Sequence, residues 1–215
     1  MSNSGFFITL EGGEGTGKST QIKKLAALLE EKGRAVVVTR EPGGTPEAEK
    51  IRNLFTQRDG GNWTPVAECL LLFAARNMHV ERLIKPSLAD NRIVISDRFT
   101  DSTRAYQSYG HGLELDFIES LTQLSIGGFE PDLTFILDMD TEKGLGRAKE
   151  RIAETGSGED RFEQLDISFH ERLRKGFLEI AERNPDRCVI IDASRSVEEI
   201  AEEMGRVALE RIANV

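Results

Sequence analysis

The stretch FFITLEGGEGTGKST, residues 6–20, decides the fold class of this chain. It opens with mostly apolar residues whose aromatic and β-branched side chains are typical of a strand. A loop with four glycines follows and ends in Lys18, Ser19 and Thr20. Beyond the loop, leucine and isoleucine recur at helical spacing from Ile22 to Leu29. The order strand, glycine-rich loop, helix is the one in which phosphate-binding loops occur.

The loop itself has the chemistry of an anion site. Glycines adopt backbone angles closed to other residues, so consecutive N–H groups can turn toward one phosphate. From Gly12 the spacing is G-x-x-x-x-G-K-S, the P-loop pattern, in which the lysine reaches the β- and γ-phosphates and the serine ligates Mg²⁺. We therefore expect ATP with Mg²⁺ here. The residues expected to bind the triphosphate are Gly12, Gly13, Glu14, Gly15, Thr16, Gly17, Lys18, Ser19 and Thr20.

Composition narrows the class of protein. The chain has 215 residues, 39% hydrophobic and 30% charged, which suits one globular domain. No apolar run approaches the ~20 residues of a membrane helix, and the start of the chain shows no signal-peptide pattern. Cys69 and Cys188 are expected to be buried thiols in a reducing cytoplasm. The net charge of −9 argues against a nucleic-acid polymer as partner.

Strand-like runs occur at residues 6–10, 35–39, 92–96, 133–138 and 188–192, with helical patterns between them. This alternation predicts an α/β fold with a five-stranded parallel sheet and helices on both faces, the three-layer arrangement of P-loop NTPases. Thr64-Pro65 is expected to start a helix, and Ser196 with Glu199 to form a capping box. Ligands of such sheets bind beyond the carboxyl ends of the strands.

Charged residues follow several of these strands. REPGGT (40–45) comes after the second, and Asp97-Arg98 begins DRFTDSTRAYQ after the third. Asp97 is expected to hold Mg²⁺ together with Ser19, usually through water in such enzymes. The alternative is a structural partner for Arg98, and both roles are compatible.

The segment 146–163 carries Arg147, Lys149, Arg151 and Arg161 around the stretch ETGSG. A solvated helix face with a disordered loop is one interpretation. We favour a mobile lid that brings cations to the transferring phosphoryl group, because phosphoryl transfer depends on positioning and charge neutralisation.

Together these residues resemble the thymidylate kinase family, nucleoside monophosphate kinases of the P-loop class. The resemblance covers nearly the whole chain. It rests on LEGGEGTGKST, TREPGGT, LLFAAR, DRFTDSTRAYQ and the DRFE at residues 160–163. The combination of REPGGT with DR…AYQ at this spacing is far more specific than the P-loop alone.

The resemblance implies phosphorylation of dTMP to dTDP with ATP–Mg²⁺, in a cytoplasmic homodimer formed through the helices around 64–90 and 113–125. Arg195 would lie beside the adenine of the donor. Arg76 would read the thymine O4, where cytosine instead offers an amino donor. Tyr106 would fill the space of a ribose 2′-hydroxyl. The implied catalytic residues are Lys18, Asp97, Arg98, Arg147, Lys149 and Arg151. The implied acceptor-binding residues are Glu14, Arg40, Phe73, Arg76, Arg98, Ser102, Tyr106 and Gln107.

Two positions depart from the family pattern. Some members carry an arginine inside the P-loop where this chain has Gly15, so the basic lid would supply the missing charge, as in a bacterial subtype. Many members stack the thymine on a phenylalanine four residues before the base-reading arginine. That position is Leu72 here, with Phe73 next to it, and the sequence leaves open which of the two packs on the base.

Other functions remain as alternatives. A regulatory GTPase is disfavoured because the chain has no N-K-x-D motif. A transporter ATPase is also disfavoured. LSIGG (124–128) superficially resembles the signature motif of that class, but its residues are in the wrong order, so we interpret it as a helix end. A kinase for another monophosphate and a nucleotide-binding protein without catalysis remain open to an assay.

Overall fold

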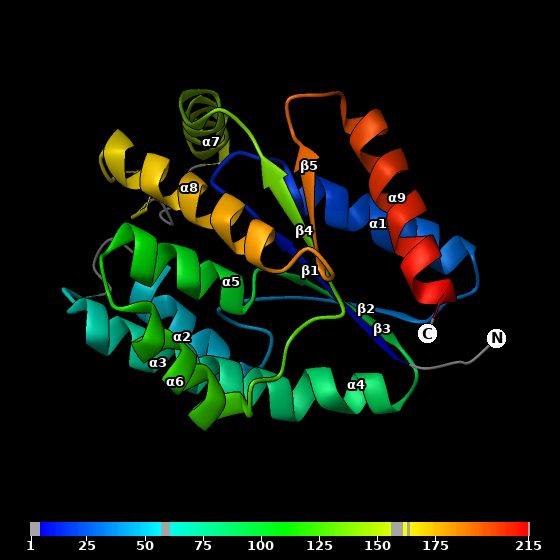
Figure 1. Cartoon of the computed structure of the whole chain (residues 1–215), viewed down its shortest axis with the longest axis horizontal. Coiled ribbons are helices and arrows are strands. Elements are labelled where there is room, and N and C mark those ends of the chain that lie inside the picture. The colour runs from blue at the N-terminus through cyan, green and yellow to red at the C-terminus, as the bar shows by residue number, and fades with distance from the viewer. Residues whose placement is uncertain (1–4, 57–60, 156–160, 163, 215) are drawn as a thin grey trace.

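The computed structural model describes residues 5–56, 61–155, 161–162 and 164–214. They form a five-stranded, all-parallel sheet in the order β2-β3-β1-β4-β5, with helices on both faces (Figure 1). Each strand predicted from the sequence is confirmed to within one residue. The strands are β1 (Phe6–Glu11), β2 (Val36–Arg40), β3 (Ile93–Asp97), β4 (Leu133–Asp138) and β5 (Cys188–Asp192).

Helices connect the strands along the chain. They are α1 (Lys18–Glu31), α2 (Pro46–Thr56), α3 (Pro65–His79), α4 (Lys85–Ala89), α5 (Thr100–Thr103), α6 (Leu115–Ile126), α7 (Thr141–Thr155), α8 (Ile167–Arg183) and α9 (Val197–Ala213). Two π-helical segments, Val80–Ile84 and Arg104–Gly110, continue α3 and α5. The predicted helix starts are confirmed: the Thr64 hydroxyl caps α3, and Ser196 with Glu199 forms the capping box of α9.

The central strand β1 is buried on both faces, which explains its continuous apolar sequence. Phe6, Ile8 and Leu10 pack on the side of α1 and α9. Phe7 points to the opposite side, where it packs with Val80 and other apolar residues. Each such buried side chain contributes roughly 1.5–3 kcal/mol of hydrophobic stabilisation. Because successive side chains of β1 point to opposite faces of the sheet, the strand packs against the helices on both sides.

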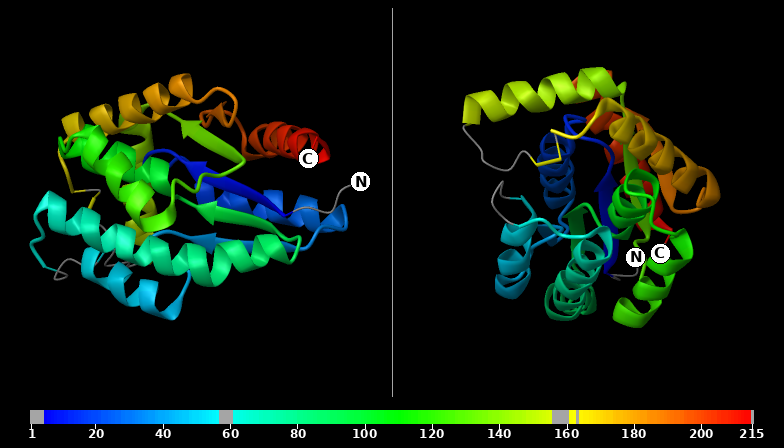
Figure 2. Two further views of the ribbon diagram at one scale, coloured as in Figure 1. Left: turned by 60° about the horizontal axis from the view of Figure 1, so that its bottom comes forward. Right: turned by 90° about the vertical axis from the view of Figure 1, so that its left-hand side faces the viewer.

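The sheet order places the functional segments side by side. Because β3 pairs with β1 and Leu10 lies opposite Asp97, the end of β3 adjoins the P-loop that follows β1. Figure 2 shows α7 on one side of the carboxyl ends of the strands and α2 and α3 on the other. Within the described residues, no helix is both long enough and apolar enough to cross a bilayer.

Candidate functional site

The P-loop connects β1 to α1 and is folded around Lys18. Gly17, with φ of 90°, lies in the left-handed region at the N-terminus of α1, where the chain turns into the helix. The Nζ of Lys18 donates to the carbonyl oxygens of Gly12 at 3.1 Å and of Gly13 at 2.8 Å. Burial and the nearby Arg98 lower the pKa of Lys18 to about 8. The loop thus holds a cation at a helix N-terminus, as an anion site requires.

Ser19 and Asp97 meet beside this loop. The Ser19 hydroxyl donates to Oδ2 of Asp97 at 3.2 Å. A hydroxyl and a carboxylate are hard oxygen ligands, so these residues fit Mg²⁺. Among the residues that the structure describes, no group of three or more His, Cys, Asp and Glu could hold a metal ion.

Arg98 directly follows β3 and adopts an unusual backbone conformation, with φ of 71°. Its Nη1 donates to the Gly12 carbonyl and to the Ser102 hydroxyl, both at 3.0 Å. Its Nη2 donates to Oε1 of Glu14 at 2.8 Å. Burial raises the pKa of Glu14, but Arg98, Lys18 and other neighbours together lower it to about 2. An ionised P-loop carboxylate therefore anchors the arginine.

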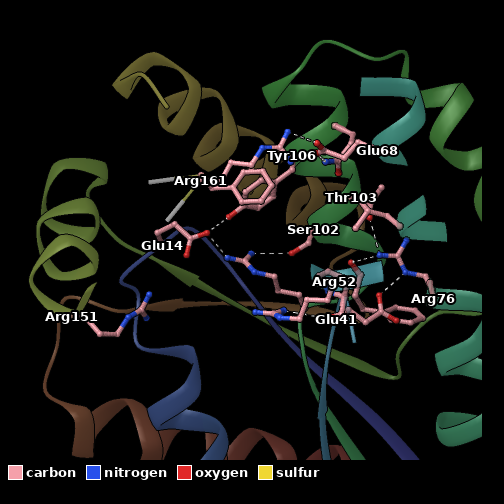
Figure 3. Close-up of a pocket in the computed structure, with 16 residues that line it drawn as sticks. Glu14, Glu41, Arg52, Glu68, Arg76, Ser102, Thr103, Tyr106, Arg151 and Arg161 are labelled. Atoms are coloured by element: carbon pink, nitrogen blue, oxygen red, sulfur yellow. Dashed lines mark hydrogen bonds and ion pairs between the residues drawn. The ribbon is translucent and has the colours of Figure 1, made fainter. Parts of the chain in front are cut away.

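A cavity of about 200 Å³ opens next to this pair (Figure 3). The P-loop contributes Glu14 to the wall of this cavity, and α7 contributes Arg151. The P-loop and the cavity are therefore adjacent. The residues around the cavity are Glu14, Glu41, Pro42, Arg52, Glu68, Leu72, Arg76, Arg98, Phe99, Ser102, Thr103, Tyr106, Gln107, Arg151, Arg161 and Phe162. Five arginines among them make it a site suited to an anionic ligand.

Arg76 is fixed in the wall of the cavity and is only 3% exposed. Its Nε donates to Glu41 at 2.7 Å, and its Nη2 donates to the Phe99 carbonyl at 3.1 Å and to the Thr103 hydroxyl at 2.8 Å. The other carboxylate oxygen of Glu41 accepts from Nδ1 of His79 at 2.9 Å. Arg76 Nη1 is buried and has no hydrogen-bond partner within the described structure. Three hydrogen bonds thus hold the guanidinium, and its Nη1 is left over.

Leu72 and Phe73 point in different directions from α3. Glu68, Leu72 and Arg76 are spaced four residues apart on α3, so they share one face, and all three line the cavity. Phe73 points elsewhere: it packs with Cys69 and Ile118 and is 3% exposed. The guanidinium of Arg76 lies 4.8 Å from its ring centroid. Phe73 therefore supports Arg76 from behind and is absent from the residues that line the cavity.

Tyr106 and Gln107 lie on the π-helical segment Arg104–Gly110 and face the same cavity. The Tyr106 hydroxyl donates to Glu14 at 2.5 Å, and its ring lies under the Arg98 guanidinium at 5.0 Å. Gln107 Nε2 donates to Oε1 of Glu68 at 3.0 Å. The structure thus brings together Glu14, Arg76, Arg98, Ser102, Tyr106 and Gln107, the core of the acceptor site predicted from the sequence.

The basic segment is only partly described. Arg147, Lys149 and Arg151 lie on α7, and of these Arg151 alone lines the cavity. Residues 156–160 and 163 of the predicted lid lie outside the described residues. Arg161 donates through Nη2 to Oε2 of the buried Glu68 at 2.8 Å, and Phe162 packs edge-on against Tyr106. The far end of the segment therefore contacts the acceptor side of the site.

Arg40 and Arg195, two further predicted site residues, also lie outside the cavity lining. Arg40, at the end of β2, donates to Glu49 of α2 at 3.1 Å and its side chain is about half exposed. Arg195 lies beyond β5 and pairs with Glu203 of α9. Neither lines the cavity.

Four polar or charged residues of the cavity were not predicted as site residues from the sequence: Glu41, Arg52, Glu68 and Thr103. Glu41 sits next to Arg40 in the REP motif, which was a usable signal. Glu68 is two helical turns before Arg76, and that spacing also pointed to a shared face. Arg52 of α2, whose Nη1 donates to the Pro42 carbonyl at 3.1 Å, had no comparable signal.

Known proteins with this sequence pattern share its fold. The sequence model of the thymidylate kinase family matches residues 10–204. The thymidylate kinase of Caulobacter vibrioides is 50% identical over 97% of this chain and 98% of that protein. That of Trichlorobacter lovleyi is 46% identical over 96% and 98%. The crystal structure of thymidylate kinase from Ehrlichia chaffeensis superimposes with a TM-score of 0.76, at 38% identity, over 95% of this chain and 99% of that one. The chain therefore belongs to the thymidylate kinase family.

Proposed function

We propose that this protein transfers the γ-phosphoryl group of ATP to dTMP, giving dTDP for dTTP synthesis. One observation carries the proposal most directly. Glu14 of the P-loop pairs with Arg98, and both line the cavity that also contains Arg76 and Tyr106. A triphosphate on the P-loop and a monophosphate in the cavity would therefore be neighbours.

On the donor side, the P-loop backbone and Lys18 bind the β- and γ-phosphates. Thr16 and Thr20 belong to the same loop and helix start. Ser19 and Asp97 would hold Mg²⁺, which would neutralise charge on the phosphates when bound. Arg195, at the end of β5, lies beside the adenine.

On the acceptor side, Arg98 binds the monophosphate, and Arg52 and Arg40 contribute charge from α2 and β2. Arg76 donates to the thymine O4, for which its unpartnered buried Nη1 is available. Ser102 and Gln107 line the base pocket. Tyr106 excludes a ribose 2′-hydroxyl, and Leu72 rather than Phe73 packs on the base because it faces the cavity.

The acceptor phosphate is already an anion, so no general base is required. Catalysis consists of holding two charged phosphates in line and cancelling their repulsion. Lys18, Arg98 and Mg²⁺ supply positive charge, and α7 adds Arg151 with Arg147 and Lys149. We infer that the single domain carries its lid at about residues 146–163, which would bring these cations to the phosphates.

We also propose a homodimer formed through α3 and α6. These helices contact each other and expose large apolar side chains, namely Val66, Leu70 and Leu124. Leu124 is 82% exposed, an unfavourable position for a leucine unless a partner covers it. The cytoplasm is the compartment we assign, since Cys69 and Cys188 are free, buried thiols.

ADP release from ATP–Mg²⁺ tests the reaction, measured with the monophosphates of deoxythymidine, deoxyuridine, uridine, cytidine, adenosine and guanosine. We expect a strong preference for dTMP, with deoxyuridine monophosphate next because it lacks only one methyl group. Preference for another base would refute the role of Arg76, and preference for a ribonucleotide would refute that of Tyr106. No turnover with any acceptor would favour a nucleotide-binding protein without catalysis.

A further inference from the structure

Glu11, the last residue of β1, has no part in the chemistry above and does not line the cavity. Its side chain is nevertheless fully buried, at 0% exposed. Oε1 accepts from the Phe99 N–H at 2.7 Å, and Oε2 accepts from the Ser102 hydroxyl at 2.5 Å. Burial of a carboxylate is unfavourable. Both hydrogen bonds of Glu11 come from the corner formed by residues 98–102, where the chain passes from β3 into α5 and which contains Arg98.

That corner needs support from its surroundings. The backbone of Arg98 has a φ of 71°, a conformation that residues other than glycine seldom adopt. Two bonds hold the backbone of Arg98 itself: its N–H donates to the Leu10 carbonyl at 3.0 Å, and its carbonyl accepts from the Ser96 hydroxyl at 2.8 Å. The bond from the Phe99 N–H to Glu11 holds the next peptide. The end of β1 thus fixes the corner on both sides.

Ser102 extends this control to the Arg98 side chain. A hydroxyl has a single hydrogen, and Ser102 donates it to Glu11. Its oxygen is then left to accept from Arg98 Nη1 at 3.0 Å. When Glu11 is ionised, its carboxylate accepts but cannot donate, so it then sets the direction of both bonds.

We propose that Glu11 is a positioning residue for the acceptor site, which holds the Arg98 guanidinium in place through Ser102 and the Phe99 peptide. The proposal rests on the proposed function, because Arg98 is the residue assigned to the acceptor phosphate. It predicts that a change at Glu11 weakens the use of dTMP and leaves the use of ATP nearly unaltered.

Glu11→Gln is the most direct test. The amide oxygen can still accept from Phe99, but the amide NH₂ then faces Ser102. The hydroxyl must turn to accept from it, and its hydrogen then points toward Arg98. We expect the KM for dTMP to rise about tenfold, while the KM for ATP stays within twofold of the wild type. Equal changes in both KM values, or no change in either, would overturn the proposal.

A double-mutant cycle with Ser102→Ala shows whether Glu11 acts through Ser102. In the Ser102→Ala background, Glu11→Gln should change the KM for dTMP less than twofold, and independent, multiplicative effects would contradict the relay. Thr9→Val is a matched control, because it removes a buried hydrogen bond to Thr134 from the same strand, without contact to Arg98. It should lower Tm without altering the ratio of the two KM values.

If Glu11→Gln folds poorly, Glu11→Asp replaces it in both backgrounds. Its shorter carboxylate retracts from Ser102, and the same loss confined to dTMP is expected. Wild-type turnover with dTMP is measured first. Its absence would refute the proposed function, whereas an active wild type with unaltered dTMP use in both Glu11 variants would refute the role of Glu11 alone.

Discussion

Gly15 of the P-loop packs backbone against backbone on Gly144 of α7. A Cβ on Gly15 would lie 1.9 Å from the Gly144 carbonyl oxygen, and a Cβ on Gly144 would lie 2.6 Å from the Glu14 carbonyl oxygen. Gly15 also has a φ of 70°. The contact joins the P-loop to the helix that carries Arg147 and Arg151. It also explains why no arginine occupies position 15: α7 fills the space where its side chain would start.

Gly15→Ala should disrupt this contact. The added methyl group meets backbone that cannot rotate away, and the left-handed φ adds strain of about 1–3 kcal/mol. We expect a lower Tm and at least a tenfold loss of kcat/KM for ATP, because both the loop and α7 must shift. Gly146→Ala is the control: apart from its own helix backbone, no atom lies within 4 Å of its added Cβ, and alanine favours a helix by up to about 1 kcal/mol. Wild-type kinetics in Gly15→Ala would show that the contact is dispensable.

Lys18→Ala should separate catalysis from stability. Loss of a cation at the transferring phosphoryl group is expected to lower kcat by about 10²–10³-fold, as for other charge-stabilising groups. Thermal unfolding should stay near the wild type, since the Nζ bonds of Lys18 go to loop carbonyls and support no core packing. Leu29→Ala, at a position 0% exposed, gives the comparison for a core defect of about 2–5 kcal/mol. If Lys18→Ala melts as early as Leu29→Ala, its role is structural.

The strands and the P-loop could be predicted because their signals are local. Apolar β-branched runs, a glycine loop and capping residues each act within a few positions. The order β2-β3-β1-β4-β5 has no local signal, because it depends on which strands pair after the chain has crossed the sheet. The left-handed backbone at Arg98 was equally hidden, since it is imposed by bonds to Leu10 and Glu11 on another strand.

The same distinction applies to the site residues: those in local motifs could be predicted, and those placed by tertiary packing could not. Arg76, Arg98 and Tyr106 lie in motifs whose pattern indicates their place. Arg52 has no motif and reaches the cavity only because α2 packs on α3. Tyr106 and Gln107 face the cavity from a π-helical segment, a local widening of the helix that sequence periodicity does not indicate and that occurs often at functional sites.

Truncation of Leu72 should weaken the use of dTMP, whereas truncation of Phe73 should lower the stability of the protein. Leu72→Ala removes a cavity wall, so we expect a several-fold higher KM for dTMP with little change in Tm. Phe73→Ala opens a hole in the core behind Arg76, so we expect a loss of about 3–5 kcal/mol in the free energy of unfolding. Urea unfolding and initial-rate kinetics on both variants test the pair. A KM effect confined to Phe73→Ala would place the phenylalanine on the base.

The cations of α7 should contribute unequally. Arg151 lines the cavity and its charge acts on Glu14, whereas Arg147 and Lys149 do not line it. We expect Arg151→Met to lower kcat by at least tenfold and Arg147→Met by less. Each variant is measured at saturating ATP and dTMP, so that the difference reports on the transfer step. Equal losses would mean that α7 changes its position when both nucleotides are bound.

The ionisation of Glu11 should appear in the pH dependence of stability. Burial, and then the charge of Asp101, raise the pKa of Glu11 from 4.5 to about 7, against the opposing pull of Arg98. Between these two values the folded chain binds a proton that the unfolded chain releases. The free energy of unfolding therefore falls as the pH rises through this window.

Glu11→Gln removes this titration, because an amide carries no proton to lose. Relative to Glu11→Gln, the wild type should therefore lose up to about 2–3 kcal/mol of stability between pH 5 and pH 8. Urea unfolding of both proteins at pH 5, 6, 7 and 8 measures the difference, in which titrations common to both cancel. Parallel stability curves would show that Glu11 stays ionised throughout, in which case Arg98 outweighs the effect of burial.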